Sequence, residues 1–172
     1  MSHAGATNRH LVLIGLMGSG KTTVGRIVAE RLRRTFIDTD AEIERRTGRS
    51  VREIFATDGE PEFRRIETQV VADVVADPVP CVIAAAGGVV LEPANRTALR
   101  EGSCRVVWLV AEPAALLARV QHGAHRPLLD DDPEGTLNRM AAEREQWYRA
   151  TADAIVRVDG RSVQDVVEAV LR

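Results

Sequence analysis

The chain has 172 residues, of which 45% are apolar and 28% are charged, values typical of one globular domain with a substantial core. Its net charge of −2 and aromatic content of 3% argue against a nucleic-acid-binding surface, which needs a basic face or base-stacking rings. No apolar run approaches the length of a membrane span, and residues 1–10 lack the apolar segment of a secretory signal. We therefore expect a cytoplasmic, monomeric protein of one domain, residues 1–172, that binds neither nucleic acid nor membrane.

Short apolar runs alternate along the chain with amphipathic stretches. The predicted strands are 10–14, 35–37, 80–85, 105–110 and 154–158. The predicted helices are 21–33, 40–47, 51–57, 60–76, 93–100, 113–121, 133–149 and 162–171. Strands that alternate with helices indicate crossover connections, and hence an α/β fold with a parallel sheet covered on both faces. Ligands of such sheets bind beyond the carboxyl ends of the strands.

Several predicted helices carry recognisable start signals. Ser50 precedes the helix at 51–57 and has Glu53 three residues later, which is the spacing of a capping box. Pro93 and Pro113 suit the first turns of their helices, and Ser162 is a predicted N-cap for the last one.

The segment GLMGSGKTTVG, residues 15–25, directly follows the first predicted strand. Gly15, Gly20, Lys21 and Thr22 match the pattern G-x-x-x-x-G-K-[ST]. Bare backbone lets several N–H groups converge on phosphate oxygens, and the following helix adds its positive dipole end. Lys21 supplies a point charge to the β- and γ-phosphates, and the Thr22 hydroxyl can bind Mg²⁺. We therefore predict that the protein binds a nucleoside triphosphate with Mg²⁺.

Asp38 and Asp40 in FIDTD follow the second predicted strand. Two carboxylates at this edge of the sheet can orient a hydrated metal ion and accept a proton from a hydroxyl group. A pair of solvated turn aspartates is the alternative interpretation.

Arg64 and Glu67 lie three positions apart in GEPEFRRIE, so they share one face of a predicted helix. Arg64 can clamp an anionic substrate while Glu67 holds its guanidinium, although a surface ion pair is the commoner arrangement.

Arg126 lies in HGAHRPLLDDDP, 122–133, where glycine and prolines break the helical pattern. A mobile lid with an arginine can bring positive charge to a transferring phosphoryl group and exclude water; an ordinary loop arginine is the alternative.

Taken together, these segments resemble the shikimate kinase family over nearly the whole chain, from about residue 9 to the last helix. The similar segments are GLMGSGKTTVGRIVA, DTDAEIERRTGRSVREIF, DGEPEFRRIE, GGVV, and RPLL followed by EREQWYR. The resemblance implies a three-layer α/β/α P-loop kinase fold with a five-stranded parallel sheet of order 2-3-1-4-5. It further implies acceptor-binding helices at about 40–76 and a mobile lid at about 122–133.

The same resemblance implies an ATP-dependent transfer of the γ-phosphoryl group to the 3-hydroxyl of shikimate, in aromatic amino-acid (chorismate) biosynthesis. The implied nucleotide-binding residues are Gly18, Ser19, Gly20, Lys21, Thr22, Thr23 and Arg119, the last of them against the adenine. The implied Mg²⁺ residues are Thr22 and Asp38. The implied substrate-binding residues are Asp40, Phe55, Phe63, Arg64, Gly87, Gly88 and Arg144. The implied catalytic residues are Lys21, Asp40 and Arg126.

One position departs from the family pattern, which usually has three successive glycines after the third strand. Here Ala86 precedes Gly87 and Gly88, and its methyl group narrows a backbone-lined pocket unless the residue has a negative φ. A P-loop kinase for another polyhydroxy acid or a cyclitol, such as a gluconate-type kinase, is therefore the alternative function. A non-catalytic nucleotide-binding relative is a further alternative, but it would be expected to lose Lys21, Asp40, Arg64 or Arg126, and all four are present.

Two pairs of residues have an alternative metal or disulfide interpretation. Cys81 and Cys104 adjoin apolar segments, so buried free thiols are expected in preference to a disulfide. His122 and His125 in the predicted lid are expected to be exposed loop side chains in preference to metal ligands.

Overall fold

A five-stranded parallel sheet in the order β2-β3-β1-β4-β5 forms the centre of the molecule. This computed structural model describes residues 8–120 and 131–172. The strands are β1 (His10–Ile14), β2 (Phe36–Asp38), β3 (Val82–Ala84), β4 (Cys104–Val110) and β5 (Ala154–Arg157). Their order and direction confirm the predicted doubly covered α/β sheet.

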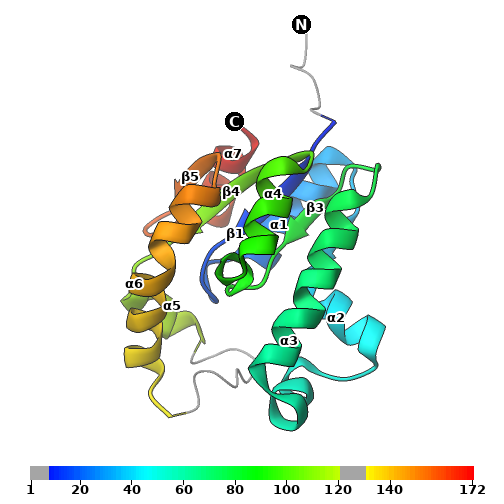
Figure 1. Cartoon of the computed structure of the whole chain (residues 1–172). Helices are drawn as coiled ribbons and strands as arrows, with labels where there is room; N and C mark the ends of the chain where they lie inside the picture. The colour runs from blue at the N-terminus through cyan, green and yellow to red at the C-terminus, as the bar shows by residue number, and fades with distance from the viewer. Residues whose placement is uncertain (1–7, 121–130) are drawn as a thin grey trace, which may run out of the picture.

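Helices cover both faces of this sheet (Figure 1). Their bounds are α1 (Lys21–Leu32), α2 (Thr39–Thr47), α3 (Val51–Ala76), α4 (Pro93–Glu101), α5 (Pro113–Val120), α6 (Pro133–Thr151) and α7 (Val163–Leu171), with a 3₁₀ turn, η1, at Val89–Leu91. Helices α1 and α7 pack together on one face, while α3, α4 and α6 lie on the other (Figure 1). None of the helices within the described ranges is both long and apolar enough to cross a bilayer.

The predicted helix starts are confirmed. Ser50 and Ser162 each form a complete capping box, and Pro93 and Pro113 are the first residues of α4 and α5. The helices predicted at 51–57 and 60–76 are two segments of α3, which leaves helical geometry at Gly59 with φ 83° and ψ 171°. The turn at 89–91 was not predicted, because a single 3₁₀ turn has no apolar period long enough to recognise.

The core forms around β1, whose five residues are all buried. Cys81 and Cys104, at the opposite end of the sheet from the phosphate loop, are buried free thiols, as the sequence predicted. Burial raises the pKa of each thiol to about 11, so both are protonated at neutral pH. His10 lies beside Cys81, with 3.1 Å between Nδ1 and Sγ.

Candidate functional site

A cavity of about 850 Å³ lies at the carboxyl end of the sheet, where the loops after β1, β2 and β3 meet. Every predicted site residue in the described part of the chain lines it: Gly18, Ser19, Gly20, Lys21, Thr22, Thr23, Asp38, Asp40, Phe55, Phe63, Arg64, Gly87, Gly88, Arg119 and Arg144. Arg126 lies outside the described residues, as do His122 and His125 and most of the predicted lid. The cavity is large enough for a small ligand beside a nucleotide tail.

The phosphate loop leaves the start of α1 open to an anion. Helices α2, α3 and α7 begin with a side-chain cap and an acidic residue in the first turn. Helix α1 has neither: its N-cap is Gly20, in left-handed geometry at φ 94°, and its first turn contains no acidic residue. The backbone N–H groups of its first turn therefore meet no competing side chain, which suits phosphate oxygens.

Lys21 is the first residue of α1, and its side chain folds back over the phosphate loop. Its Nζ donates to the carbonyl oxygens of Gly15 and Leu16, at 2.7 Å and 2.9 Å. A Cβ at Gly15 would lie 2.4 Å from the carbonyl oxygen of Leu109, so the tight turn that brings these carbonyls together requires glycine. The loop thus holds an ammonium group next to the open end of α1.

Asp38 joins the phosphate loop to α2. One carboxylate oxygen accepts a 2.9 Å hydrogen bond from the Thr22 hydroxyl. The other accepts from the backbone N–H groups of Asp40 and Ala41, at 3.0 Å and 3.2 Å, and caps α2. Asp38 is therefore held in place by hydrogen bonds as the N-cap of α2, unlike a solvated aspartate in a turn.

The Thr22–Asp38 pair also fits Mg²⁺ chemistry. A hydroxyl and a carboxylate side by side are hard oxygen ligands, and Mg²⁺ usually takes only one or two of these from the protein beside phosphate and water. Within residues 8–120 and 131–172 there is no cluster of three or more His, Cys, Asp or Glu side chains that could hold a metal ion by itself. A metal bound here would therefore depend on phosphate oxygens and water for the rest of its coordination shell.

Arg64 and Glu67 form a buried pair, so the commoner surface arrangement that the sequence left open is wrong here. Their exposed fractions are 8% and 0%. Arg64 Nη1 donates to Glu67 Oε2 at 2.9 Å, and Nη2 donates to Glu60 Oε1 at 3.1 Å. Burial raises the pKa of Glu67 to about 7, although the Arg64 cation opposes this shift. The guanidinium is thus held from two sides and faces the cavity with little freedom.

Arg144 brings a second buried guanidinium to the same cavity from α6. Its exposed fraction is 4%, and its Nε has no hydrogen-bond partner among the described residues. A buried donor without a partner carries a free-energy cost that an incoming acceptor group would remove. Arg64 and Arg144 together therefore favour an anionic ligand, and a carboxylate suits their fork geometry.

An aromatic wall stands beside these cations. The Phe55 and Phe63 rings lie 4.7 Å apart between centroids and are tilted by 39°. The Arg64 guanidinium carbon also lies 5.1 Å from the centroid of the Phe63 ring. The acceptor end of the cavity thus combines an apolar side with a cationic side, as a carboxylated ring would require.

Two residues that sequence reasoning missed hold the loop after β3. Thr39 Oγ1 accepts a 3.0 Å hydrogen bond from the Ala86 backbone N–H, and the Tyr148 hydroxyl donates to the Gly87 carbonyl. Thr39 lies between the two aspartates of the predicted site, and Tyr148 lies one helical turn after Arg144. Both positions were available from spacing, but neither side chain has an obvious chemical role by itself.

Ala86 keeps its methyl group without backbone strain. Among the described non-glycine residues, positive φ occurs at Arg33 alone, so Ala86 does not adopt the conformation that would require glycine. Its side chain lines the cavity. Alanine at the first position of the family's three-glycine pattern therefore causes no backbone strain in this loop.

Arg119 approaches the phosphate loop from α5. Its Nη1 donates to the Gly18 carbonyl at 3.1 Å, and the side chain is exposed. This places a planar cation beside the phosphate loop, in the lining of the cavity.

Comparisons with known proteins agree with this geometry. Residues 17–172 match the family described as shikimate kinase. A shikimate kinase of Symbiobacterium thermophilum is 49% identical over 165 residues, which cover 94% of each chain. The solved structure of a shikimate kinase from Acinetobacter baumannii in complex with shikimate superposes with a TM-score of 0.90 at 35% identity, over 95% of this chain and 90% of that one. A gluconokinase from Sinorhizobium meliloti shares the fold, with a TM-score of 0.61 at 20% identity over 96% of this chain and 90% of that one.

Proposed function

Because the chain belongs to the shikimate kinase family, whose members are ATP-dependent kinases, we propose that it transfers the γ-phosphoryl group of ATP to the 3-hydroxyl of shikimate in aromatic amino-acid biosynthesis. One observation carries the proposal: the uncapped start of α1 and two buried guanidinium groups open into the same cavity. The first feature suits a triphosphate tail, and the second suits the carboxylate of a small acceptor.

The proposed nucleotide half uses the loop residues 18–23. Their backbone N–H groups and Lys21 hold the phosphates, while Arg119 lies against the adenine and Arg126 contributes a further cation from a lid at about 122–133. Thr22 and Asp38 would hold Mg²⁺, Asp38 by way of a water molecule. When bound, Mg²⁺ neutralises charge on the phosphate oxygens.

The proposed acceptor half lies in helices at about 40–76, the loop after β3, and α6. Arg64 and Arg144 grip the shikimate carboxylate, Phe55 and Phe63 wall the ring, and the backbone of Gly87 and Gly88 contacts it. Asp40 binds the acceptor hydroxyls and accepts the proton of the attacking one. The acceptor oxygen then bonds to the γ-phosphorus as the bond to the ADP oxygen breaks.

The same proposal extends to the setting of the reaction. We place it in a single domain, residues 1–172, that acts as a monomer in the cytoplasm with Mg²⁺ and binds neither nucleic acid nor membrane. The aromatic wall favours a ring such as that of shikimate over an open-chain acid such as gluconate. The carboxylate clamp favours shikimate over an uncharged cyclitol.

An acceptor screen tests the proposed function. The purified chain with Mg·ATP is expected to release ADP with shikimate and at background level with gluconate or an uncharged cyclitol. The variant Ala86→Gly is expected to keep the same order of acceptors, because Ala86 has no positive φ that glycine would relieve. ADP release is followed in a coupled assay. Turnover with gluconate or the cyclitol but not with shikimate would support the alternative function instead.

Gly88→Ala provides a test of where Arg64 sits. A Cβ at Gly88 would lie 2.3 Å from both terminal nitrogens of the Arg64 guanidinium, which must then move away. Gly88 itself has φ −92°, so alanine adds no backbone strain. We expect the KM for shikimate to rise at least about tenfold, because a bidentate charge-assisted contact is lost, while the KM for ATP changes little.

Gly87→Ala is the matched control, because a Cβ there would meet its nearest atoms at 3.5 Å, an ordinary contact distance. A smaller change in the KM for shikimate is expected from this variant, measured in the same steady-state assay. Equal changes in the two variants would contradict the assigned position of the Arg64 guanidinium.

A further inference from the structure

The break in α3 divides the acceptor wall between two helical segments. Phe55 lies on the first segment, residues 51–58, and Phe63 and Arg64 lie on the second, residues 60–76. The backbone between the two segments leaves helical geometry at Gly59. An unbroken helix would fix the spacing of these side chains, but across this break other contacts must fix it.

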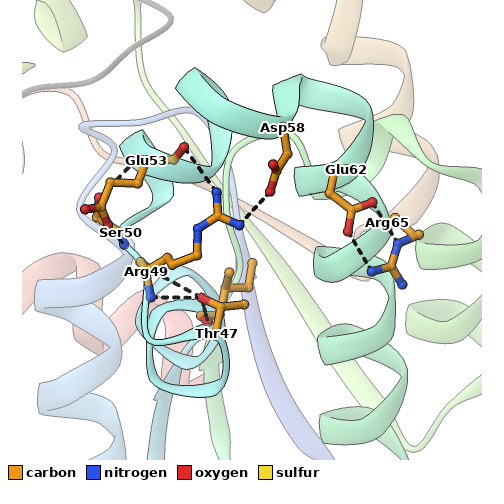
Figure 2. Close-up of polar contacts among 8 residues, drawn as sticks. Thr47, Arg49, Ser50, Glu53, Asp58, Glu62 and Arg65 are labelled. Atoms are coloured by element: carbon orange, nitrogen blue, oxygen red, sulfur yellow. Dashed lines mark hydrogen bonds and ion pairs between the residues drawn. The ribbon is translucent and has the colours of Figure 1, made fainter.

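One side chain spans the first segment from outside the cavity. Arg49 lies in the connection between α2 and α3 and does not line the cavity. Its Nη1 donates to Asp58 Oδ2 at 2.6 Å, and its Nη2 lies 3.5 Å from the Glu53 carbonyl oxygen. Figure 2 shows the guanidinium reaching both places, one near the start of the segment and one at its end.

The base of this side chain is itself fixed. The Arg49 backbone N–H donates to Thr47 Oγ1 at 3.3 Å (Figure 2). The single proton of that hydroxyl is shared between the carbonyl oxygens of Ile43 and Arg49, at 2.9 Å and 3.2 Å. Ser50, the next residue, caps the segment. Arg49 therefore joins the end of α2 to the last residue before the break.

On the basis of the proposed function, we propose that Arg49 is a positioning residue for the acceptor pocket. Its ion pair with Asp58 holds the first segment of α3 on the end of α2, which Arg46 ties to Asp73 on the second segment. The pair thereby sets the Phe55 wall relative to the Arg64 clamp. Because Arg49 does not line the cavity, its effect passes to acceptor binding through the lining residues of the first segment, which are Val51, Arg52 and Phe55. None of the phosphate-loop residues 18–23 takes part in the Arg49 contacts with Asp58 and Glu53.

A pair on the second segment supplies a matched control. Arg65 donates to Glu62 through Nε and Nη2, at 2.9 Å and 2.7 Å, on the exterior of the same helix (Figure 2). Its side chain is 69% exposed and ties together two residues on the same side of the break. Arg65→Met thus removes an arginine–carboxylate pair without releasing the first segment.

The test compares Arg49→Met, Asp58→Asn, the double variant and Arg65→Met in steady-state kinetics. Removal of the Arg49–Asp58 pair is expected to raise the KM for shikimate about fivefold, since partly exposed ion pairs contribute up to about 1 kcal/mol. The KM for ATP is expected to stay within about twofold, and the double variant to match the single ones, as expected for one shared interaction. Arg49→Lys, which keeps the charge, is expected to recover part of the loss.

Amide hydrogen exchange provides a readout that does not depend on turnover. Residues 51–58 are expected to exchange faster in Arg49→Met and at the wild-type rate in Arg65→Met. Faster exchange with an unchanged KM for shikimate would overturn the positioning role, as would equal KM changes for ATP and shikimate. A wild-type chain that exchanges normally but never phosphorylates shikimate would instead remove the proposed function.

Discussion

Lys21→Met is expected to lower turnover of shikimate by about 100-fold to 1,000-fold, the range found when one preorganised donor to a transition state is removed. Methionine is unbranched and nearly as long as lysine, but it cannot carry charge to the β- and γ-phosphates. The hydrogen bonds from Nζ to Gly15 and Leu16 are lost as well. Turnover is measured by coupled ADP release, and folding by circular dichroism and thermal melting. A folded variant with near-normal turnover would contradict the role given to Lys21.

Two further measurements separate charge from shape at this position. Lys21→Arg keeps the cation but replaces a compact ammonium by a planar fork, so turnover is expected to stay low. Lys21 is the only lysine in the 172-residue chain, so an amine-specific acetylating reagent can modify only this side chain and the α-amino group. Mg·ATP is expected to slow acetylation of Lys21. An acetylation rate unaffected by Mg·ATP would place the triphosphate elsewhere.

The strands of the sheet were predictable because each contains a short apolar run that is bounded by turn or helix signals. The apolar run at β1 is buried at every position, as a central parallel strand should be, and the glycine-rich turn marks its end. Strand ends were less predictable. The strand predicted at 80–85 pairs only over Val82–Ala84, since pairing depends on where the neighbouring strands end. The order of the strands came from the resemblance and not from the periodicity.

The members of the site were more predictable than their surroundings. The spacing of Arg64 and Glu67 predicted a shared face, but spacing does not say whether that face is buried, and burial is what raises the pKa of Glu67. Contacts between segments that are distant in the sequence could not be predicted either. Tyr148 and Gly87 are 61 positions apart, and a hydroxyl–carbonyl hydrogen bond leaves no mark in the sequence. Arg49 likewise looked like any surface arginine before its contact with Asp58 was seen.

Arg64→Met is expected to raise the KM for shikimate about 100-fold, since two charge-assisted hydrogen bonds to the substrate carboxylate would be lost. The KM for ATP is expected to change little, because the proposed role of Arg64 is to bind the acceptor carboxylate and not the phosphates of ATP. Arg65→Met, one residue along the helix, removes an exposed pair and is the control for general damage. Equal losses of affinity for ATP and shikimate would contradict a clamp specific to the acceptor.

The same variant has a pH signature that follows from its buried partner. The folded-state pKa of Glu67, about 7, lies above its ordinary value of 4.5. Ionisation of Glu67 therefore lowers the stability of the wild-type protein as the pH rises between these two values, and it adds no further loss above about pH 7.

Without the Arg64 cation the pKa of Glu67 rises further, because the carboxylate is buried and loses its partner. The stability of Arg64→Met is therefore expected to keep falling above about pH 7, by up to about 1.4 kcal/mol per pH unit, while the contribution of Glu67 in the wild type stays level. Denaturant unfolding at about pH 5, 7 and 9 measures the difference in stability between the wild type and each variant. This difference is expected to widen between pH 7 and pH 9 for Arg64→Met and to stay constant for Arg65→Met. Parallel curves for Arg64→Met and the wild type would mean that Arg64 does not hold the charge of Glu67, and the two-sided support of the clamp would have to be abandoned.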